Sequence, residues 1–113
     1  MDRQQIGLKL ALNALGQDLD LSSFDQRLIL QKTIYLVQAA NVDLGYSFHW
    51  YLRGPYSPAL TRDAFGVQAE LTQNADDLND WKLDSVSLER LDRLRGLLRA
   101  VPDTKRATHL ERG

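Results

Sequence analysis

Residues 30–65 carry the strongest structural signals in this chain of 113 residues. They begin in an apolar helical pattern, continue through an aromatic segment that alternates strictly, and reach a turn with two prolines. A period of 3.6 residues predicts a helix and a period of two predicts a strand. This stretch therefore predicts helix, strand, turn and helix in succession. It contains no recognisable catalytic constellation.

Apolar periodicity and helix-ending residues predict four helices in the whole chain. They cover residues 2–16, 24–40, 58–71 and 86–101. The second helix carries apolar residues around nearly its whole circumference, which predicts a central, buried helix. Gly16 is expected just past the end of the first helix, and Pro102 is expected to stop the last one.

Capping residues support three of these helix starts. Ser23 opens a capping-box pattern, and Ser57 precedes Pro58, which fits the first helical position because its missing N–H is harmless there. Asp84 or Ser85 is expected to cap the last helix. Capping also explains Ser57 better than a nucleophile does, because no adjacent base is indicated.

The aromatic segment 46–53 predicts a strand whose two faces differ. One face, expected to lie on the core, consists of Tyr46, Phe48, Trp50 and Leu52. The other face consists of Ser47, His49, Tyr51 and Arg53. Gly54–Pro55 is expected to end the strand, and a short strand at residues 81–84 is its expected partner.

The predicted fold is mainly α (α+β): four helices with a short two-stranded β-ribbon, winged-helix-like. We expect one compact domain over residues 1–102 and a flexible tail over residues 103–113.

Composition narrows the classes of function. The chain has no cysteine, so it can form neither a disulfide nor a thiolate zinc site. His49 and His109 lie far apart, glycine-rich phosphate loops are absent, and no apolar run approaches the length that spans a bilayer. No catalytic residue, metal or cofactor is therefore expected, and cytoplasmic residence is the default.

The second helix, the aromatic strand and the turn together resemble a known family. The letters LQKTIYLVQ, followed by the strand and by GPYSPAL, are similar to the Panacea (SocA-like antitoxin) domain family and the related YwgA-like proteins. The likeness covers residues 24–71, and its motif positions are Gln31, Lys32, Gly54, Pro55, Ser57 and Pro58. It implies a non-enzymatic module that binds a toxin or hands it to a protease.

The residues themselves also favour a protein partner. Aromatic side chains with polar tips and arginines are enriched at interfaces. The predicted partner-binding residues of this kind are His49, Tyr51, Arg53, Tyr56 and Arg62. The identity of the partner and the oligomeric state stay open.

A winged-helix-like, DNA-binding transcriptional regulator is the alternative function. Residues 1–85 hold 7 Lys/Arg and 11 Asp/Glu, a net charge of −4, whereas residues 86–113 hold 7 and 4, a net charge of +3. In this alternative, Arg62, Arg90, Arg93 and Arg99 would contact phosphates. The acidic balance of residues 1–85 favours protein binding instead.

Overall fold

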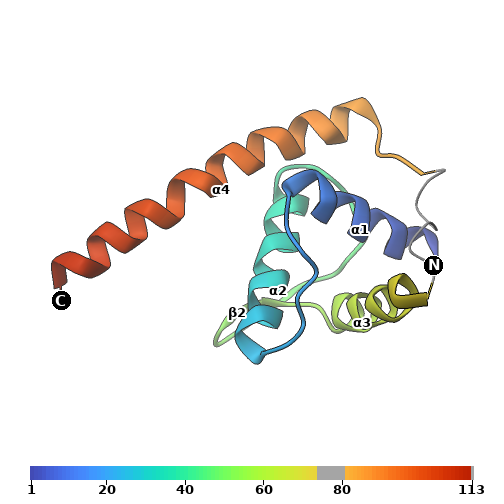
Figure 1. Ribbon diagram of the computed structural model, residues 1–113, viewed down its shortest axis with the longest axis horizontal. Coiled ribbons are helices and arrows are strands. Elements are labelled where there is room, and N and C mark those ends of the chain that lie inside the picture. The colour runs from blue at the N-terminus through green and yellow to red at the C-terminus, as the bar shows by residue number, and fades with distance from the viewer. Residues whose placement is uncertain (74–80, 113) are drawn as a thin grey trace.

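The computed structural model describes the backbone of residues 1–73 and 81–112, and the side-chain surroundings of residues 1–72 and 81–99. Its elements are α1 (Arg3–Leu15), α2 (Phe24–Ala39), β1 (His49–Tyr51), β2 (Gly54–Tyr56), α3 (Pro58–Gln73) and α4 (Ser85–Arg112). Figure 1 shows the hairpin of β1 and β2 at the periphery, beside the first half of α2. The predicted fold class, mainly helical with a short β-ribbon, is confirmed.

The helices begin and end at the residues that their local chemistry favours. Ser23, Ser57 and Asp84 each accept a hydrogen bond from the backbone N–H three residues later, at 3.1, 3.3 and 2.7 Å. The same bond lowers the pKa of the Asp84 carboxyl. Gly16 adopts a left-handed φ of 71° after α1, which glycine tolerates because it lacks a side chain. Asp2, for which the sequence pattern predicted no role, caps α1 with a complete capping box.

The prediction that Pro102 stops the last helix is wrong. α4 continues to Arg112, and its second half projects away from the other helices (Figure 1). Proline removes one backbone donor and disfavours a helix interior without forbidding it. The lysine, arginines, alanine, leucine and glutamate that follow it are good helix formers, which favours continuation. The predicted mobility of residues 103–113 stays a prediction.

The predicted pairing of the aromatic strand with residues 81–84 is also wrong. β1 pairs with β2 in an antiparallel hairpin, with Trp50 opposite Pro55 and Tyr51 opposite Gly54, and residues 81–84 are not a strand. Gly54 has a φ of 117°, a conformation that side chains disfavour, and this permits the tight turn. Closing so short a loop costs little entropy, which favours the local partner.

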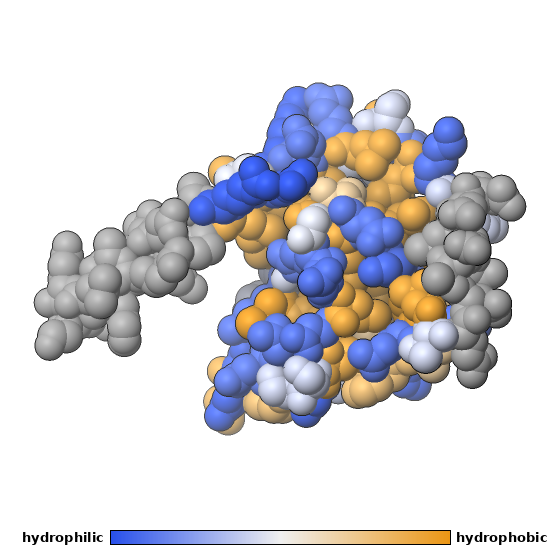
Figure 2. Space-filling model, in the orientation of Figure 1, coloured by the Kyte–Doolittle hydropathy of each residue, from blue (hydrophilic) through white to orange (hydrophobic). Residues whose placement is uncertain are grey.

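The hydrophobic core lies among all four helices and the segment that leads into the hairpin. α1 packs against both α3 and α4, and α2 packs against β2 and α3. The fully buried side chains at its centre are Leu8, Leu12, Ile34, Val37, Val42, Leu60, Val67 and Leu91. Figure 2 shows that hydrophobic residues also reach the surface in several places on one face of the molecule.

Two expectations about burial are wrong in part. Tyr46 is buried and Phe48 packs against the core, but Trp50 is 68% exposed and Leu52 is fully exposed. Only the start of the aromatic segment reaches the core, since the hairpin then runs outward along α2 (Figure 1). α2 is likewise not buried all round, because Phe24, Ile29 and Leu36 are exposed.

Candidate protein-binding surface

Gln31 holds the end of the hairpin against α2. Its side-chain amide is buried and hydrogen-bonds both backbone groups of Ser57, which is buried as well. The Ser57 N–H donates to Gln31 Oε1 at 2.8 Å, and Gln31 Nε2 donates to the Ser57 carbonyl oxygen at 3.1 Å. Gln31 Nε2 also donates to Thr61 Oγ1 at 2.9 Å. An apolar side chain at position 31 would leave the buried Ser57 N–H unpaired, whereas the Ser57 carbonyl oxygen would keep its bond from the Thr61 N–H at 3.3 Å.

Gln38 makes the same arrangement at the beginning of the segment. The Tyr46 N–H donates to Gln38 Oε1 at 2.9 Å, and Gln38 Nε2 donates to the Tyr46 carbonyl oxygen at 2.8 Å. Gln31 and Gln38 are two helical turns apart, so they lie on one side of α2. Together the two glutamines fix residues 46–57 to the helix. This gives the Gln positions of the LQKTIYLVQ pattern a structural role.

The hairpin and the adjacent half of α2 form an exposed apolar surface. Phe24 is 53% exposed and Trp50 68% exposed, and Leu52 has no cover. The Tyr35 ring packs edge-on against those of Phe48 and Trp50, with centroids 5.6 and 5.3 Å apart. We call this the hairpin surface and define it as Phe24, Leu28, Lys32, Tyr35, Leu36, Trp50, Tyr51, Leu52 and Arg53.

Two shallow hollows flank the turn of the hairpin. One has a volume of about 770 Å³ and includes Lys32, Tyr35, Leu36 and Trp50 in its wall. The other, of about 550 Å³, is lined largely by apolar and aromatic side chains, including Phe24 and Tyr56. Leu28, Leu52, Arg53, Gly54 and Pro55 line both. The two hollows are depressions in the hairpin surface into which side chains of a partner can fit.

The charges of this surface are mostly positive. The Arg53 guanidinium lies over the Phe24 ring, 5.4 Å from its centroid. Within the described part of the chain, neither Arg53 nor Lys32 forms an ion pair. Asp25 is the acidic residue that lines the same hollow. Both cations are therefore available to carboxylates of a partner.

The predicted partner-binding residues are only partly brought together. Tyr51 and Arg53 belong to the hairpin surface, and Tyr56 supports it, since its ring packs edge-on against Tyr51 at 5.9 Å. His49 is exposed on the same strand but does not line either hollow, and Arg62 is exposed on α3, also outside them.

Sequence reasoning missed the apolar part of the surface, in particular Phe24, Leu36, Trp50 and Leu52. One signal for it was present. α2 carries more apolar residues than a single buried stripe requires, so some of them had to reach the surface or a partner.

Two arginines of α4, Arg90 and Arg93, have partners within the chain. Arg90 Nη1 donates to the Asn41 carbonyl oxygen at 2.7 Å, and Arg93 pairs with Glu89 at 2.7 Å. Arg99 is exposed. Arg90 and Arg93 would have to exchange these partners to bind phosphate, which weakens the DNA-binding alternative.

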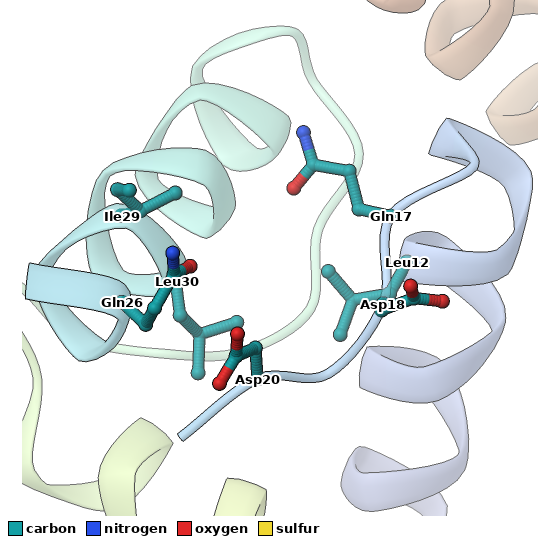
Figure 3. A pocket seen from close by; sticks show the side chains of 7 residues that line it. All are labelled: Leu12, Gln17, Asp18, Asp20, Gln26, Ile29 and Leu30. Carbon is teal, nitrogen blue, oxygen red and sulfur yellow. The ribbon is translucent and has the colours of Figure 1, made fainter. Parts of the chain in front are cut away.

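A third hollow, of about 310 Å³, lies between the end of α1, the following linker and α2. Figure 3 shows Gln26, Ile29 and Leu30 of α2 on one side and Leu12, Gln17 and Asp18 on the other. The Asp20 carboxylate accepts bonds from the Ser22 N–H and hydroxyl, which lower its pKa. It therefore stays ionised in a turn and is not tuned for general acid–base chemistry near neutral pH.

The described residues contain no group of three or more His, Asp or Glu side chains placed to hold a metal ion. None of the helices among them is both long and apolar enough to cross a bilayer.

Comparisons of the chain with protein-family models, with curated proteins and with solved structures gave no match.

Proposed function

We propose that this chain is a non-enzymatic, cytoplasmic protein-interaction module that binds its partner through the hairpin surface. The observation that carries the proposal is an exposed cluster of large apolar side chains centred on Trp50 and Leu52, on a segment that Gln31 and Gln38 hydrogen-bond to α2 at Ser57 and Tyr46. Contiguous apolar exposure of this kind marks interaction sites in folded proteins.

The chemistry of the surface restricts the partner. Apolar or aromatic anchors would enter the two hollows, and carboxylates would pair with Arg53 and Lys32. Holding residues 46–57 in place before binding lowers the entropic cost of association. The resemblance to Panacea domains adds a class of partner, a toxin or another regulatory protein.

The test is capture of a partner by matched variants. Leu52→Asp places a charge on the exposed apolar turn, whereas Leu97→Asp makes the same change on α4 at a residue that is 66% exposed. The tagged wild type and the Leu97→Asp variant should retain the same protein from lysate, and Leu52→Asp should lose it at least tenfold. The captured protein is then purified and titrated against all three chains by calorimetry.

The variant Tyr51→Ala/Arg53→Ala tests the polar part of the surface in the same titration. Both residues are exposed, so their loss should leave the melting temperature nearly unchanged. Equal affinity of wild type, Leu52→Asp and Tyr51→Ala/Arg53→Ala for the purified partner would refute the proposal.

The DNA-binding alternative predicts a different result. Duplex binding would be tight and salt-dependent, and replacing Arg90, Arg93 and Arg99 together with Gln would flatten that dependence. The slope would change by about 1 for each phosphate that the variant no longer neutralises. Such binding without capture of any protein would favour the alternative.

A further inference from the structure

The outer edge of β1 is open. The sheet has two strands, and among the described residues no strand lies beyond β1. α2 packs against β2, so it covers the other side of the hairpin. All three residues of β1 are exposed.

The pairing with Pro55 fixes which backbone groups point outward. In an antiparallel ladder, hydrogen-bonded and non-hydrogen-bonded pairs alternate. Pro55 has no N–H to donate, so Trp50 and Pro55 form a non-hydrogen-bonded pair. The N–H and C=O of Trp50 therefore point away from β2, and no described side chain or loop takes them up.

β1 also lacks the usual protection of an edge strand. Natural proteins block exposed edges with proline, lysine, bulges or covering elements. β2 has Pro55 and the cover of α2, whereas β1 reads His-Trp-Tyr, with no charge and no proline. Such an edge is a template for another strand.

The sequence of this edge is complementary to itself. Around Trp50, the residues one position away are the polar-tipped aromatics His49 and Tyr51, and those two positions away are the apolar Phe48 and Leu52. Residues 46–52 contain no Asp, Glu, Lys or Arg. We propose that β1 pairs antiparallel with β1 of a second copy of this chain, with the two-fold axis at Trp50.

This dimer satisfies the open backbone groups and covers apolar area. Trp50 would face Trp50 of the second copy in a hydrogen-bonded pair, Phe48 would face Leu52, and His49 would face Tyr51. No like charges meet directly across the strands, so none opposes the pairing. A closed, isologous two-fold contact forms a four-stranded sheet and leaves the His49 and Tyr51 face free.

The first test measures mass against concentration for the purified full-length chain. Three matched proteins are compared: wild type, Trp50→Lys and Trp81→Lys, the last changing another exposed tryptophan, outside the hairpin. By sedimentation, the wild type and Trp81→Lys should rise from 12.9 kDa toward twice that mass, and Trp50→Lys should stay at 12.9 kDa. Because a short strand pair buries little area, the rise is expected at high concentration.

The second test uses cross-linking, which the cysteine-free sequence makes specific. Two copies of Trp50→Cys would lie with Cα atoms about 5.5 Å apart, within the range of a disulfide. Two copies of His49→Cys would be offset along the strands by two residues, about 7 Å, which places their Cα atoms about 8 Å apart, too far for a disulfide. Under mild oxidation, Trp50→Cys should form dimer at least tenfold faster than His49→Cys.

Each outcome of the two tests either supports or overturns the proposed dimer. A mass rise abolished only by Trp50→Lys, with selective cross-linking at position 50, supports it. A wild type that remains monomeric at every concentration, a Trp50→Lys variant that still dimerises, or equal cross-linking at positions 49 and 50 overturns it. Circular dichroism on each variant verifies the fold. No partner protein is present, so the result is independent of the proposed function.

Discussion

At the scale of the residue, two glutamine side chains supply backbone hydrogen bonds that a neighbouring strand would otherwise make. A primary amide offers one acceptor and two donors, so it can pair with the N–H and the C=O of one residue at once. Gln31 and Gln38 do this for Ser57 and Tyr46. Side chains of α2 thereby hydrogen-bond the backbone on both sides of the hairpin, at Tyr46 before β1 and at Ser57 after β2.

Replacing Gln31 should be costly although methionine has nearly its shape. Gln31→Met leaves the buried N–H of Ser57 unpaired and removes one of the two hydrogen bonds to its carbonyl oxygen, so it should lower the free energy of unfolding by about 1–3 kcal/mol. Gln68, exposed on α3, is the matched control, and Gln68→Met should change stability by less than about 0.5 kcal/mol. Urea unfolding measures both. A Gln31→Met variant as stable as the control would show that the double hydrogen bond is dispensable.

Tyr46 gives the fold a dependence on alkaline pH. Burial, and then its 2.8 Å hydrogen bond to Asp63, raise the pKa of the Tyr46 hydroxyl far above its ordinary value. In the unfolded chain the phenol ionises near pH 10, at about its ordinary pKa. A folded pKa above the unfolded one contributes stability that is complete below about pH 10 and is lost as the pH rises further.

Tyr46→Phe should remove this dependence. The variant should lose about 1–3 kcal/mol near neutral pH, because the bond to a carboxylate is lost. Its stability should then fall less steeply than that of the wild type above about pH 10. Tyr51→Phe, at an exposed tyrosine, serves as the control. Parallel curves of unfolding free energy against pH for wild type and Tyr46→Phe would contradict this account.

At the scale of the element, the sequence predicted the helix starts better than it predicted which strands pair. The helix starts at Ser23, Ser57 and Asp84 were predicted because a cap and its helix are adjacent in sequence. The partner of the aromatic strand was not, because a Gly-Pro pair such as Gly54–Pro55 usually marks the end of a strand. A glycine at a tight turn and a proline at a non-hydrogen-bonded edge position are compatible with a hairpin.

Gly54 should be intolerant of a side chain, as its φ of 117° requires. Gly54→Ala should lower stability by about 1–2 kcal/mol, because the backbone conformation is strained for any L residue. The new methyl would also lie 3.3 Å from Lys32 Cε, a flexible neighbour. Gly96→Ala is the control within α4, where nothing lies within 4 Å of the added carbon. That change should raise stability, by up to about 1 kcal/mol.

The two alanine substitutions are compared by thermal and urea unfolding. Opposite signs at positions 54 and 96 are expected. A Gly54→Ala variant that gains stability would mean that the turn can adopt an ordinary conformation and that the glycine is incidental.

At the scale of the whole molecule, the exposed surface depends on how the elements assemble. The alternation of residues 46–53 placed Tyr46 and Phe48 on the core side correctly, but it did not predict that Trp50 and Leu52 pass beyond the core. That outcome depends on the leucines of α1, α3 and α4, which close the core without these two side chains. The exposure of Trp50 and Leu52 was therefore not predictable from the local pattern of the strand, although Tyr51 and Arg53 were.

Effects on stability and effects on binding should consequently be separable with one core variant and one surface variant. Ile34 is fully buried, so Ile34→Ala should lower the free energy of unfolding by about 2–5 kcal/mol, because apolar atoms are removed from the core and a cavity remains. Trp50 is large but exposed, so Trp50→Ala should cost less than about 1 kcal/mol, mostly from its packing against Tyr35.

Trp50→Ala should nevertheless weaken self-association and partner capture, which Ile34→Ala should affect only through the fraction unfolded. Urea unfolding and sedimentation on the same samples distinguish the two effects. A destabilisation of several kcal/mol at Trp50 would place the hairpin inside the cooperative core and remove the basis for treating it as a binding surface.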